Sequence, residues 1–545
     1  MMETAQISEF GRYSGYSKPH YDGWTRNSQY IEVRDGVKLA VDIFRPSKNG
    51  RPASEPLPLV WTHTRYRRSI IENGKRLTWL DQPHLQTLVK HGYVVGVVDA
   101  RGSGASFGIW KGIFTNEETR DSYDLIEWFA KQPWCDGSVG MFGGSYQGMT
   151  QLMVAAMAPP HLKAIIPWFS FADLYEVAYP GGIFRDDLAR TWSDLTKFID
   201  TVQPAAPVDS DSEGALLKKA NETHKLNRSI LEILSPLRFR NDNDEATGCS
   251  PYFDWSPGNY FAGINKSGVA VYLWGGWFDA FVRDTFVFYR NLDVPKRMTI
   301  GPWSHSAKDV SGSADYSTLY EVEQLRWFDF WLRGIENGIM DEPPIRYFTL
   351  GVPESINWKT TQQWPPPRVE KTPYYFHGGP SGSIHSVNDG VLDTGLPRSK
   401  GARDEYQVDY STTSGQKTRW DNVVVPGNFD YPDMTSNDVK ALTYTTMPLS
   451  FDIEVTGHPI ITLWVGSTAN DADFFAYLEE VDQQRVSRYV TEGVQKASHR
   501  AVHNPPFDYL GLPWHRSFKE DIVNLVPGAP AELSFDMHPI SHIFK

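Results

Sequence analysis

Short apolar runs alternate with segments of helical periodicity through the first part of the chain. Val- and Ile-rich runs bounded by turn-forming residues are typical of buried strands, whereas apolar residues at every third or fourth position are typical of helices. The pattern predicts strands at 30–33, 37–44, 59–62, 93–99, 138–142, 164–166, 269–273 and 298–301, and helices at 80–91, at 119–131 and after 145. This alternation predicts a mostly parallel sheet with helices on both faces.

The alternation stops in two places, which suggests separate structural units. Residues 169–266 are mixed and helical and begin with clustered aromatics, so we expect a cap over the sheet, although most of these aromatics need only hold the cap together. From 339 onward, Pro-rich stretches and period-two alternation, as at 345–350, predict an all-β domain with core strands at 460–465 and 474–479. The predicted division is a core at 1–168 and 267–338, with a surface arm at 1–28, a helical cap at 169–266 and a β domain at 339–545.

Composition favours a packed protein of more than one domain. The 545 residues exceed one ordinary core, and 40% are hydrophobic and 14% aromatic, with 19 Trp. The formal net charge of −13, with no long basic cluster, argues against nucleic acid or an anionic membrane as a partner. The sequence does not determine the oligomeric state, and a homodimer is the one assembly that we consider.

The compartment is predicted from the cysteines and the apolar runs. The first residues lack a basic region followed by an apolar core, and no apolar run approaches the ~20 residues that span a bilayer. Cys135 and Cys249 lack metal-ligand spacing, so we expect two free thiols, with one disulfide as the alternative. The sequence therefore predicts a cytoplasmic protein.

The segment 143–148, GGSYQG, lies between a predicted strand and a predicted helix. A serine on so sharp a turn needs small neighbours, and the following helix N-terminus favours negative charge on a bound carbonyl oxygen. Ser145 is therefore the candidate nucleophile. The usual G-x-S-x-G pattern is not strictly met, because Gln147 precedes Gly148. Taken alone, the segment is equally compatible with an ordinary tight turn.

Partners for the serine are expected at the carboxyl ends of the predicted strands. A serine needs a base, and the base needs an acid that fixes its tautomer. His305 follows the strand at 298–301, whereas His63 precedes the serine, against the usual order of serine, acid and histidine. Asp279, after the strand at 269–273, is the preferred acid. Asp284 is expected to be a solvated charge on the next helix, and Asp309 is a further alternative.

An oxyanion requires two donors. The backbone N–H of Tyr146 and the hydroxyl of Tyr66, in the loop after the strand at 59–62, are the candidates. Packing alone would equally explain Tyr66. The sequence has no H-E-x-x-H, paired C-x-x-C or P-loop pattern, so we expect neither a metal nor an organic cofactor.

Several segments, taken in order, resemble the family of cocaine-esterase-like hydrolases, which is related to X-prolyl dipeptidyl peptidases and α-amino-acid ester hydrolases. They are TRYRR at 64–68, DARGSGAS at 99–106, GGSYQGMTQ at 143–151, WFDAFVRDT at 277–285 and GPWSHS at 301–306, with TGHPIITLWV at 456–465, DADFFAYLEEVD at 471–482 and YVTEGVQKASHR at 489–500 in the last domain. The family pattern is G-x-S-Y-x-G, which this chain satisfies.

The resemblance implies an α/β-hydrolase domain, a helical cap and a C-terminal jelly-roll-like β domain. It also assigns site residues: Ser145 as nucleophile, Asp279 and His305 as its partners, Tyr66 and Tyr146 as the oxyanion hole, and Phe281 in the acyl pocket, beside which Trp168 is a second candidate for substrate binding. Phe281 and Val282 occupy places where the amino-ester hydrolase branch has carboxylates for a substrate ammonium group. Recognition of a free α-amino group is therefore not expected.

The predicted function is hydrolysis of esters with small, aromatic or otherwise bulky acyl groups. An amidase or X-prolyl-type peptidase acting on a small-molecule amide is the alternative within the enzymes. The alternative from another class is a non-catalytic protein that binds a carbohydrate or polymer through its β domain.

Overall fold

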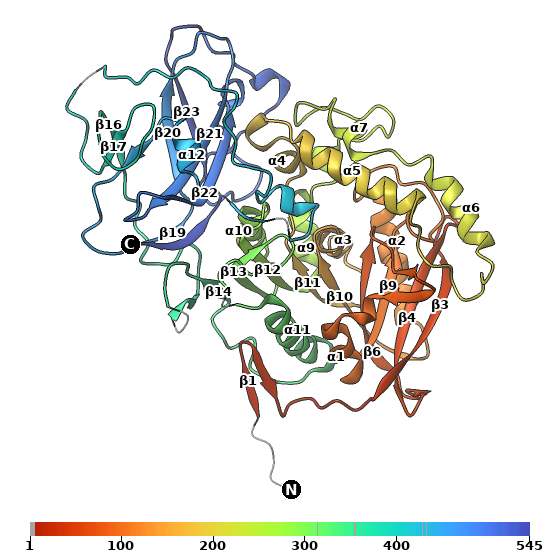
Figure 1. The fold of residues 1–545 in the computed structure, drawn as a ribbon. Helices are drawn as coiled ribbons and strands as arrows, with labels where there is room; N and C mark the ends of the chain where they lie inside the picture. The colour runs from red at the N-terminus through yellow and green to blue at the C-terminus, as the bar shows by residue number, and fades with distance from the viewer. Residues whose placement is uncertain (1–5, 313, 354–355, 400, 428, 432) are drawn as a thin grey trace.

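An eleven-stranded sheet organises the fold (Figure 1). Its order is β15-β14-β13-β12-β11-β10-β6-β9-β4-β3, with β5 paired to β4. The computed structural model describes residues 6–312, 314–353, 356–399, 401–427, 429–431 and 433–545. The strands are β3 (Gly23–Glu32), β4 (Lys38–Lys48), β5 (Arg51–Pro52), β6 (Leu57–Thr64), β9 (Val94–Asp99), β10 (Cys135–Gly144), β11 (Leu162–Trp168), β12 (Ala270–Phe278), β13 (Lys296–Ser304), β14 (Ile345–Phe348) and β15 (Trp358–Thr361).

The middle of the sheet is parallel, as predicted. Pairings from β9 through β6, β10, β11, β12 and β13 to β14 are parallel, whereas β3, β4 and β15 join antiparallel. Every residue of β9 and β12 is buried. Strands covered on both faces need apolar side chains at successive positions, which explains why β9 and β12 consist mostly of apolar and aromatic residues.

Each face of the sheet has its own core. Trp61 and Met141 pack with α2 (Asn116–Ala130), α3 (Tyr146–Ala155) and α10 (Val282–Asn291) on one face. Val60 and Phe142, their neighbours in sequence, pack with α1 (Pro83–Lys90) and α11 (Tyr316–Arg333) on the other. The period-two alternation of a strand thus supplies both cores.

The segment predicted as a cap is helical. It contains α4 (Leu174–Ala178), α5 (Asp186–Thr201), α6 (Ala215–His224), α7 (Ile230–Leu234), α8 (Pro251–Asp254) and α9 (Phe261–Ser267). A third buried cluster joins aromatics of this segment, such as Tyr175 and Tyr252, to Tyr146 at the start of α3. Phe261 and Ile264 of α9 instead belong to the core that α2, α3 and α10 form with the sheet. Figure 1 shows α4, α5 and α7 lying across the end of the molecule that holds α3.

The C-terminal part forms an all-β domain beside the cap, drawn in blue in Figure 1. Its antiparallel pairs are β19–β24, β20–β23 and β21–β22, and β16, β17 and β18 form a small sheet. Strands are present at the predicted positions 460–465 and 474–479, but their residues alternate mainly between exposed and half-buried, so neither is a buried core strand. The elements are β16 (Tyr375–His377), β17 (Gly390–Asp393), α12 (Thr435–Asp438), β18 (Tyr444–Thr445), β19 (Ile453–Gly457), β20 (Ile460–Val465), β21 (Asp473–Val481), β22 (Ser487–Lys496), β23 (Ala531–Asp536) and β24 (Ile540–Phe544).

The strand expected within 345–350 is present as β14, and it extends the central sheet. β14 pairs parallel with β13 in the central sheet, and Met298 lies opposite Ile345. β15 then closes this edge antiparallel. Alternating apolar residues indicate a strand but not the sheet it joins, so the pairing of β14 with β13 could not be predicted from local pattern.

Residues 1–28 were predicted to form a surface arm, and residues 1–5 of this arm lie outside the described range. The remaining residues contain regular secondary structure. β1 (Ile7–Glu9) and β2 (Arg12–Ser14) form a hairpin, and β3 starts at Gly23. The Gly11 N–H donates to Glu323 and the Tyr13 hydroxyl to Asp329, both on α11. These carboxylates are 312 and 316 residues further along the chain. The contacts that order the hairpin therefore leave no local signal. A second hairpin joins β7 (Ser69–Glu72) and β8 (Lys75–Thr78).

Candidate active site

Ser145 stands on the turn between β10 and α3. Its φ of 55° and ψ of −124° lie outside the regions that most non-glycine residues adopt. Added Cβ atoms would lie 2.3 Å from the Trp168 side chain at Gly144 and 2.1 Å from Ser170 Oγ at Gly148. The requirement for small neighbours is therefore confirmed, and the glycine at 148 serves the packing even though it comes one place late.

The turn places the serine at the positive end of a helix. The Ser145 carbonyl accepts from the N–H groups of Gly148 (2.8 Å) and Met149 (3.0 Å), which starts α3 at Tyr146. The first N–H groups of a helix have no partner within it and carry partial positive charge. The Tyr146 N–H is therefore available to a bound oxyanion next to the serine.

Asp279 and His305 form a hydrogen-bonded pair. β12 and β13 are adjacent, and Phe278 lies opposite Ser304, so the residue after each strand reaches the same edge of the sheet. Asp279 Oδ1 lies 2.7 Å from His305 Nδ1, and both residues are buried. Among the described residues, His305 Nε2 and Asp279 Oδ2 have no hydrogen-bond partner. The pair therefore presents one ring nitrogen that is free to exchange a proton.

Ser145 reaches this pair through β11. Its N–H donates to the carbonyl of Trp168 (2.9 Å), and the next residue, Phe169, packs its ring 5.9 Å from the His305 imidazole. The structure thus brings the serine to the same edge of the sheet as the pair, while the His305 Nε2 atom stays unbonded. Catalytic contacts are often long before substrate binds, so this arrangement is compatible with a triad.

Tyr66 lies after β6, with its ring 6.1 Å from that of Tyr146. Its hydroxyl accepts a hydrogen bond of 2.9 Å from Trp192 Nε1, on α5 of the cap. Burial raises the pKa of Tyr66, which keeps the hydroxyl protonated as a donor. Because an indole N–H can only donate, the Tyr66 proton is left for another acceptor.

Glu118 was missed by the sequence analysis. The Tyr146 hydroxyl donates to both of its carboxylate oxygens, at 2.7 and 2.8 Å. Burial raises the pKa of Glu118 to about 7. Thr115 caps α2 and Glu118 stands three residues later, a spacing that suggests a surface capping box. The carboxylate instead points inward and fixes the ring of Tyr146.

The two predicted substrate-binding aromatics differ in their surroundings. Phe281 is 4% exposed, and its ring meets the His305 imidazole edge-on at 5.1 Å. Trp168 instead packs against Tyr316 and Tyr320 of α11 and closes the space beside Gly144. These contacts of Trp168 support the turn, and its assignment to substrate binding stays a prediction.

The prediction that Asp284 is a solvated charge was wrong. It lies on α10, as expected, but is 5% exposed and accepts a hydrogen bond of 2.8 Å from the Ala172 N–H. Burial raises its pKa to about 7. α10 is covered by the cap, which local periodicity could not show.

The other rejected candidates have structural roles. Asp309 accepts from the N–H groups of Ser311 and Gly312 in its own loop. His63 Nδ1 bonds Ser122 Oγ at 2.7 Å, and burial lowers the pKa of this histidine to about 3. Neither group is placed to serve Ser145.

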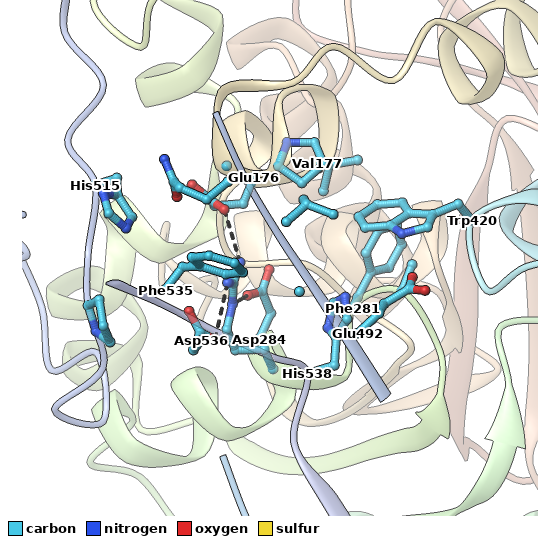
Figure 2. A pocket seen from close by; sticks show the side chains of 18 of the residues that line it. Glu176, Val177, Phe281, Asp284, Trp420, Glu492, His515, Phe535, Asp536 and His538 are labelled. Atoms are coloured by element: carbon cyan, nitrogen blue, oxygen red, sulfur yellow. Dashed lines mark hydrogen bonds and ion pairs between the residues drawn. The ribbon is translucent and has the colours of Figure 1, made fainter. Parts of the chain in front are cut away.

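A cavity at the junction of core, cap and β domain is lined by Phe281, whose ring packs on His305, but not by Ser145, Asp279 or His305 themselves. Figure 2 shows Phe281, Trp420, Glu492 and His538 on one side, with Glu176, Asp284 and Asp536 toward the other. Arg283 pairs with Glu176 at 3.3 Å and with Asp536 at 3.5 Å. The cavity therefore combines aromatic side chains, among them Phe281 and Trp420, with four carboxylates and one lining arginine, Arg283.

Three further observations concern the described part of the chain. No group of three His, Cys, Asp or Glu side chains there could hold a metal ion. None of its helices has both the length and the apolar character that a membrane span needs. Cys135 and Cys249 are free, as predicted.

Comparison with known proteins decides the family. Residues 35–307 match the family described as X-Pro dipeptidyl-peptidase (S15 family), and residues 337–545 match the X-Pro dipeptidyl-peptidase C-terminal non-catalytic domain. The chain belongs to the S15 family. The residues between the two matched ranges, 308–336, include α11.

Relatives of this S15-family chain include esterases. A Mycobacterium bovis protein named as a candidate serine esterase is 32% identical over 97% of this chain and 89% of its own length. Cocaine esterase from a Rhodococcus strain is 29% identical over 86% of this chain and 82% of its own length. The predicted relation to cocaine-esterase-like hydrolases is confirmed, and the chain is a serine hydrolase of this group.

Solved structures of S15-like proteins share the fold. An α-amino acid ester hydrolase superposes with a TM-score of 0.68 at 19% identity, covering 97% of this chain and 88% of its own. A CocE/NonD family hydrolase from Staphylococcus aureus superposes with a TM-score of 0.65 at 19% identity, covering 97% and 90%. The predicted α/β-hydrolase fold is confirmed.

Proposed function

We propose that this S15-family chain hydrolyses carboxylic esters of small aromatic or bulky acyl groups through an acyl-enzyme on Ser145. The observation that carries the proposal is the 2.7 Å bond between Asp279 Oδ1 and His305 Nδ1. Because Nδ1 is engaged, the free Nε2 is the ring atom left to accept a proton from a nucleophile.

The reaction then proceeds in two acyl-transfer steps. His305 Nε2 removes the Ser145 proton as the hydroxyl oxygen attacks the ester carbonyl, and Asp279 stabilises the imidazolium that forms. The same imidazolium protonates the departing alcohol as the acyl-enzyme forms. Water, deprotonated by His305, attacks the acyl-enzyme and regenerates the serine.

Oxyanion stabilisation falls to Tyr66 and Tyr146. The Tyr146 N–H lies at the start of α3, and the protonated Tyr66 hydroxyl has its oxygen occupied by Trp192, so its hydrogen is available. One such donor contributes about 3 kcal/mol of transition-state stabilisation. Phe281, packed on His305, lines the acyl side of the site and supports a preference for aromatic or bulky acyl groups.

The second candidate is cleavage of an amide or X-prolyl peptide. The S15 family match favours it, since the family description is that of an X-Pro dipeptidyl-peptidase. In that reaction His305 would have to protonate the nitrogen before it departs, because an amide anion is a far poorer leaving group than an alkoxide.

A matched ester and anilide with the same acyl group separate the two candidates. We expect the activated ester to be turned over far faster, and Ser145→Ala to abolish turnover while retaining substrate binding. Faster cleavage of the anilide would transfer the assignment to the peptidase activity. Absence of turnover for every activated ester would end the esterase proposal.

Two finer points belong to the same proposal. The free Cys135 and Cys249 support a cytoplasmic location, where thiols stay reduced. The antiparallel pairs β19–β24, β20–β23 and β21–β22 support a jelly-roll arrangement of the β domain.

A further inference from the structure

One turn of the chain beyond residue 339 reaches across to the Asp279–His305 pair. Arg419 Nη1 donates a hydrogen bond of 3.1 Å to the backbone carbonyl of Asp279. Asn422 Oδ1 accepts from the N–H of Ser306 at 3.0 Å, and Asn422 Nδ2 donates to Ser306 Oγ at 3.0 Å. Arg419 and Asn422 thus bond to Asp279 itself and to the residue after His305.

We propose that Arg419 and Asn422 are positioning residues for the Asp279–His305 pair. The proposal rests on the function proposed above and adds a role for a part of the chain outside the hydrolase core. Both side chains are fully enclosed, at 0% and 1% exposed. Their polar groups are therefore paired with specific partners and not with bulk water.

The Asp279 carboxylate needs this support because few other contacts hold it. Its Oδ1 bonds His305, and its Oδ2 has no hydrogen-bond partner among the described residues. The direction of the side chain therefore depends on the backbone that carries it. The Asp279 N–H donates to Gly276 at 3.0 Å, whereas its carbonyl accepts from Arg419 at 3.1 Å and from the Val282 N–H at 3.4 Å.

Arg419 is itself held from the β domain. Its Nε and Nη2 donate to the Tyr489 hydroxyl at 3.1 and 2.7 Å, and Nε lies 3.7 Å from Glu492. Tyr431 donates to Glu492 at 3.0 Å, and its ring stacks on that of Tyr489 with centroids 3.5 Å apart. Tyr489 and Glu492 belong to β22. The guanidinium therefore links a strand of the β domain to the acid of the pair.

Asn422 holds His305, the other member of the pair, through the residue that follows it. Ser306 follows His305 directly, and its hydroxyl also accepts from the Gly427 N–H at 3.0 Å. Between Arg419 and Asn422, Trp420 faces the same cavity as Phe281 (Figure 2). The turn that holds the pair thus also contributes one residue, Trp420, to the wall of that cavity.

The C-terminal region would then contribute to catalysis without touching the substrate through either residue. A displacement of about 1 Å at a reacting group can cost on the order of 100-fold in rate. Removal of either positioning residue should therefore lower kcat and leave KM nearly unchanged, because substrate contacts persist while proton transfer is misaligned.

The test compares Asn422→Leu and Arg419→Met with wild type on one activated ester. Asn422→Leu is nearly isosteric and leaves no buried charge, so it is expected to fold and to lose on the order of 10- to 100-fold in kcat. Arg419→Met should lose activity similarly, and free guanidinium ion, below concentrations that unfold wild type, should restore part of its kcat. Arg516→Met is the arginine control, since the Arg516 guanidinium pairs with Asp521 and Glu520 and not with Asp279 or Ser306.

Thermal unfolding measured on each variant separates positioning from stability. Full kcat in folded Asn422→Leu would overturn the proposal, as would a loss expressed in KM or a loss shared equally by Arg516→Met. If Arg419→Met does not accumulate, Asn422→Leu decides alone. Failure of wild type to hydrolyse the ester would count against the proposed function, whereas an active wild type with unaffected variants would count against the positioning role.

Discussion

The indole Nε1 of Trp192, on the cap helix α5, donates a hydrogen bond of 2.9 Å to the hydroxyl of Tyr66 in the loop after β6. The cap thereby orients a candidate oxyanion donor. Trp192→Phe keeps an aromatic ring but removes the N–H, and we expect kcat to fall by roughly tenfold, as for one neutral hydrogen bond.

A double-mutant cycle tests whether Trp192 affects kcat through Tyr66. Tyr66→Phe should lower kcat by about 100- to 1,000-fold. Adding Trp192→Phe to Tyr66→Phe should then have little further effect on kcat, because the group it orients is gone. Additive losses in the double variant would show that Trp192 acts on the substrate directly.

Gly148 is expected to tolerate no side chain. Its Cβ would lie 2.1 Å from Ser170 Oγ and 3.0 Å from the Trp168 carbonyl, which also accepts from the Ser145 N–H. We expect Gly148→Ala to cost about 1–3 kcal/mol of stability and to reduce kcat by displacing the turn. Gly378→Ala is the control, as no atom lies within 4 Å of its Cβ. Equal unfolding midpoints for the two variants would contradict the packing argument.

Glu118 links stability to pH. Burial raises its pKa to about 7, so between its unfolded pKa and this value the folded state binds more protons than the unfolded state. Stability from this group is full at low pH and is lost as pH rises through 7. Glu118→Gln keeps an acceptor for Tyr146 but does not titrate, so it should gain about 2 kcal/mol on wild type between about pH 5 and pH 8.

Urea unfolding of both proteins across that range measures the difference. If the difference in unfolding free energy between Glu118→Gln and wild type stays constant with pH, the pKa of Glu118 does not change on folding. Asp284 also contributes to the pH dependence of wild type, because burial raises its pKa to about 7 as well. The prediction therefore concerns the difference between the two proteins and not the absolute curve.

Phe281 is expected to set acyl size. Its ring packs on His305 and on Phe171, at centroid distances of 5.1 and 5.5 Å. Phe281→Leu should enlarge the acyl side and raise kcat/KM for branched or bicyclic acyl esters relative to acetyl esters. A series of esters with one leaving group and increasing acyl volume measures this ratio, and an unchanged ratio would place the acyl group elsewhere.

The sequence predicted the pairing of candidate site residues where these residues lie just after the carboxyl end of a strand. Asp279 and His305 were predicted because each follows an apolar run, and the register of Phe278 opposite Ser304 makes them neighbours. The order of serine, acid and histidine excluded His63, whose buried ring bonds Ser122. Topology alone could thus place the pair without knowledge of side-chain packing.

The sequence-based predictions failed where contacts between distant segments determine the surroundings of a residue. Asp284 has the polar pattern of a helix surface, yet the Ala172 N–H from the cap binds it in the interior. Glu118 has the spacing of a cap residue but bonds Tyr146, 28 positions away. Arg419 lies 140 residues from Asp279 in sequence, so their contact could not be found from either segment.

The central claim is that Ser145 is the nucleophile activated by His305. The most direct measurement is mass spectrometric mapping of the adduct formed with a fluorophosphonate probe, on wild type and on His305→Ala. We expect one phosphonylated residue, Ser145, in wild type, and greatly slowed labelling of the same residue in the variant. Labelling of another residue, or equal labelling rates with and without His305, would contradict the account.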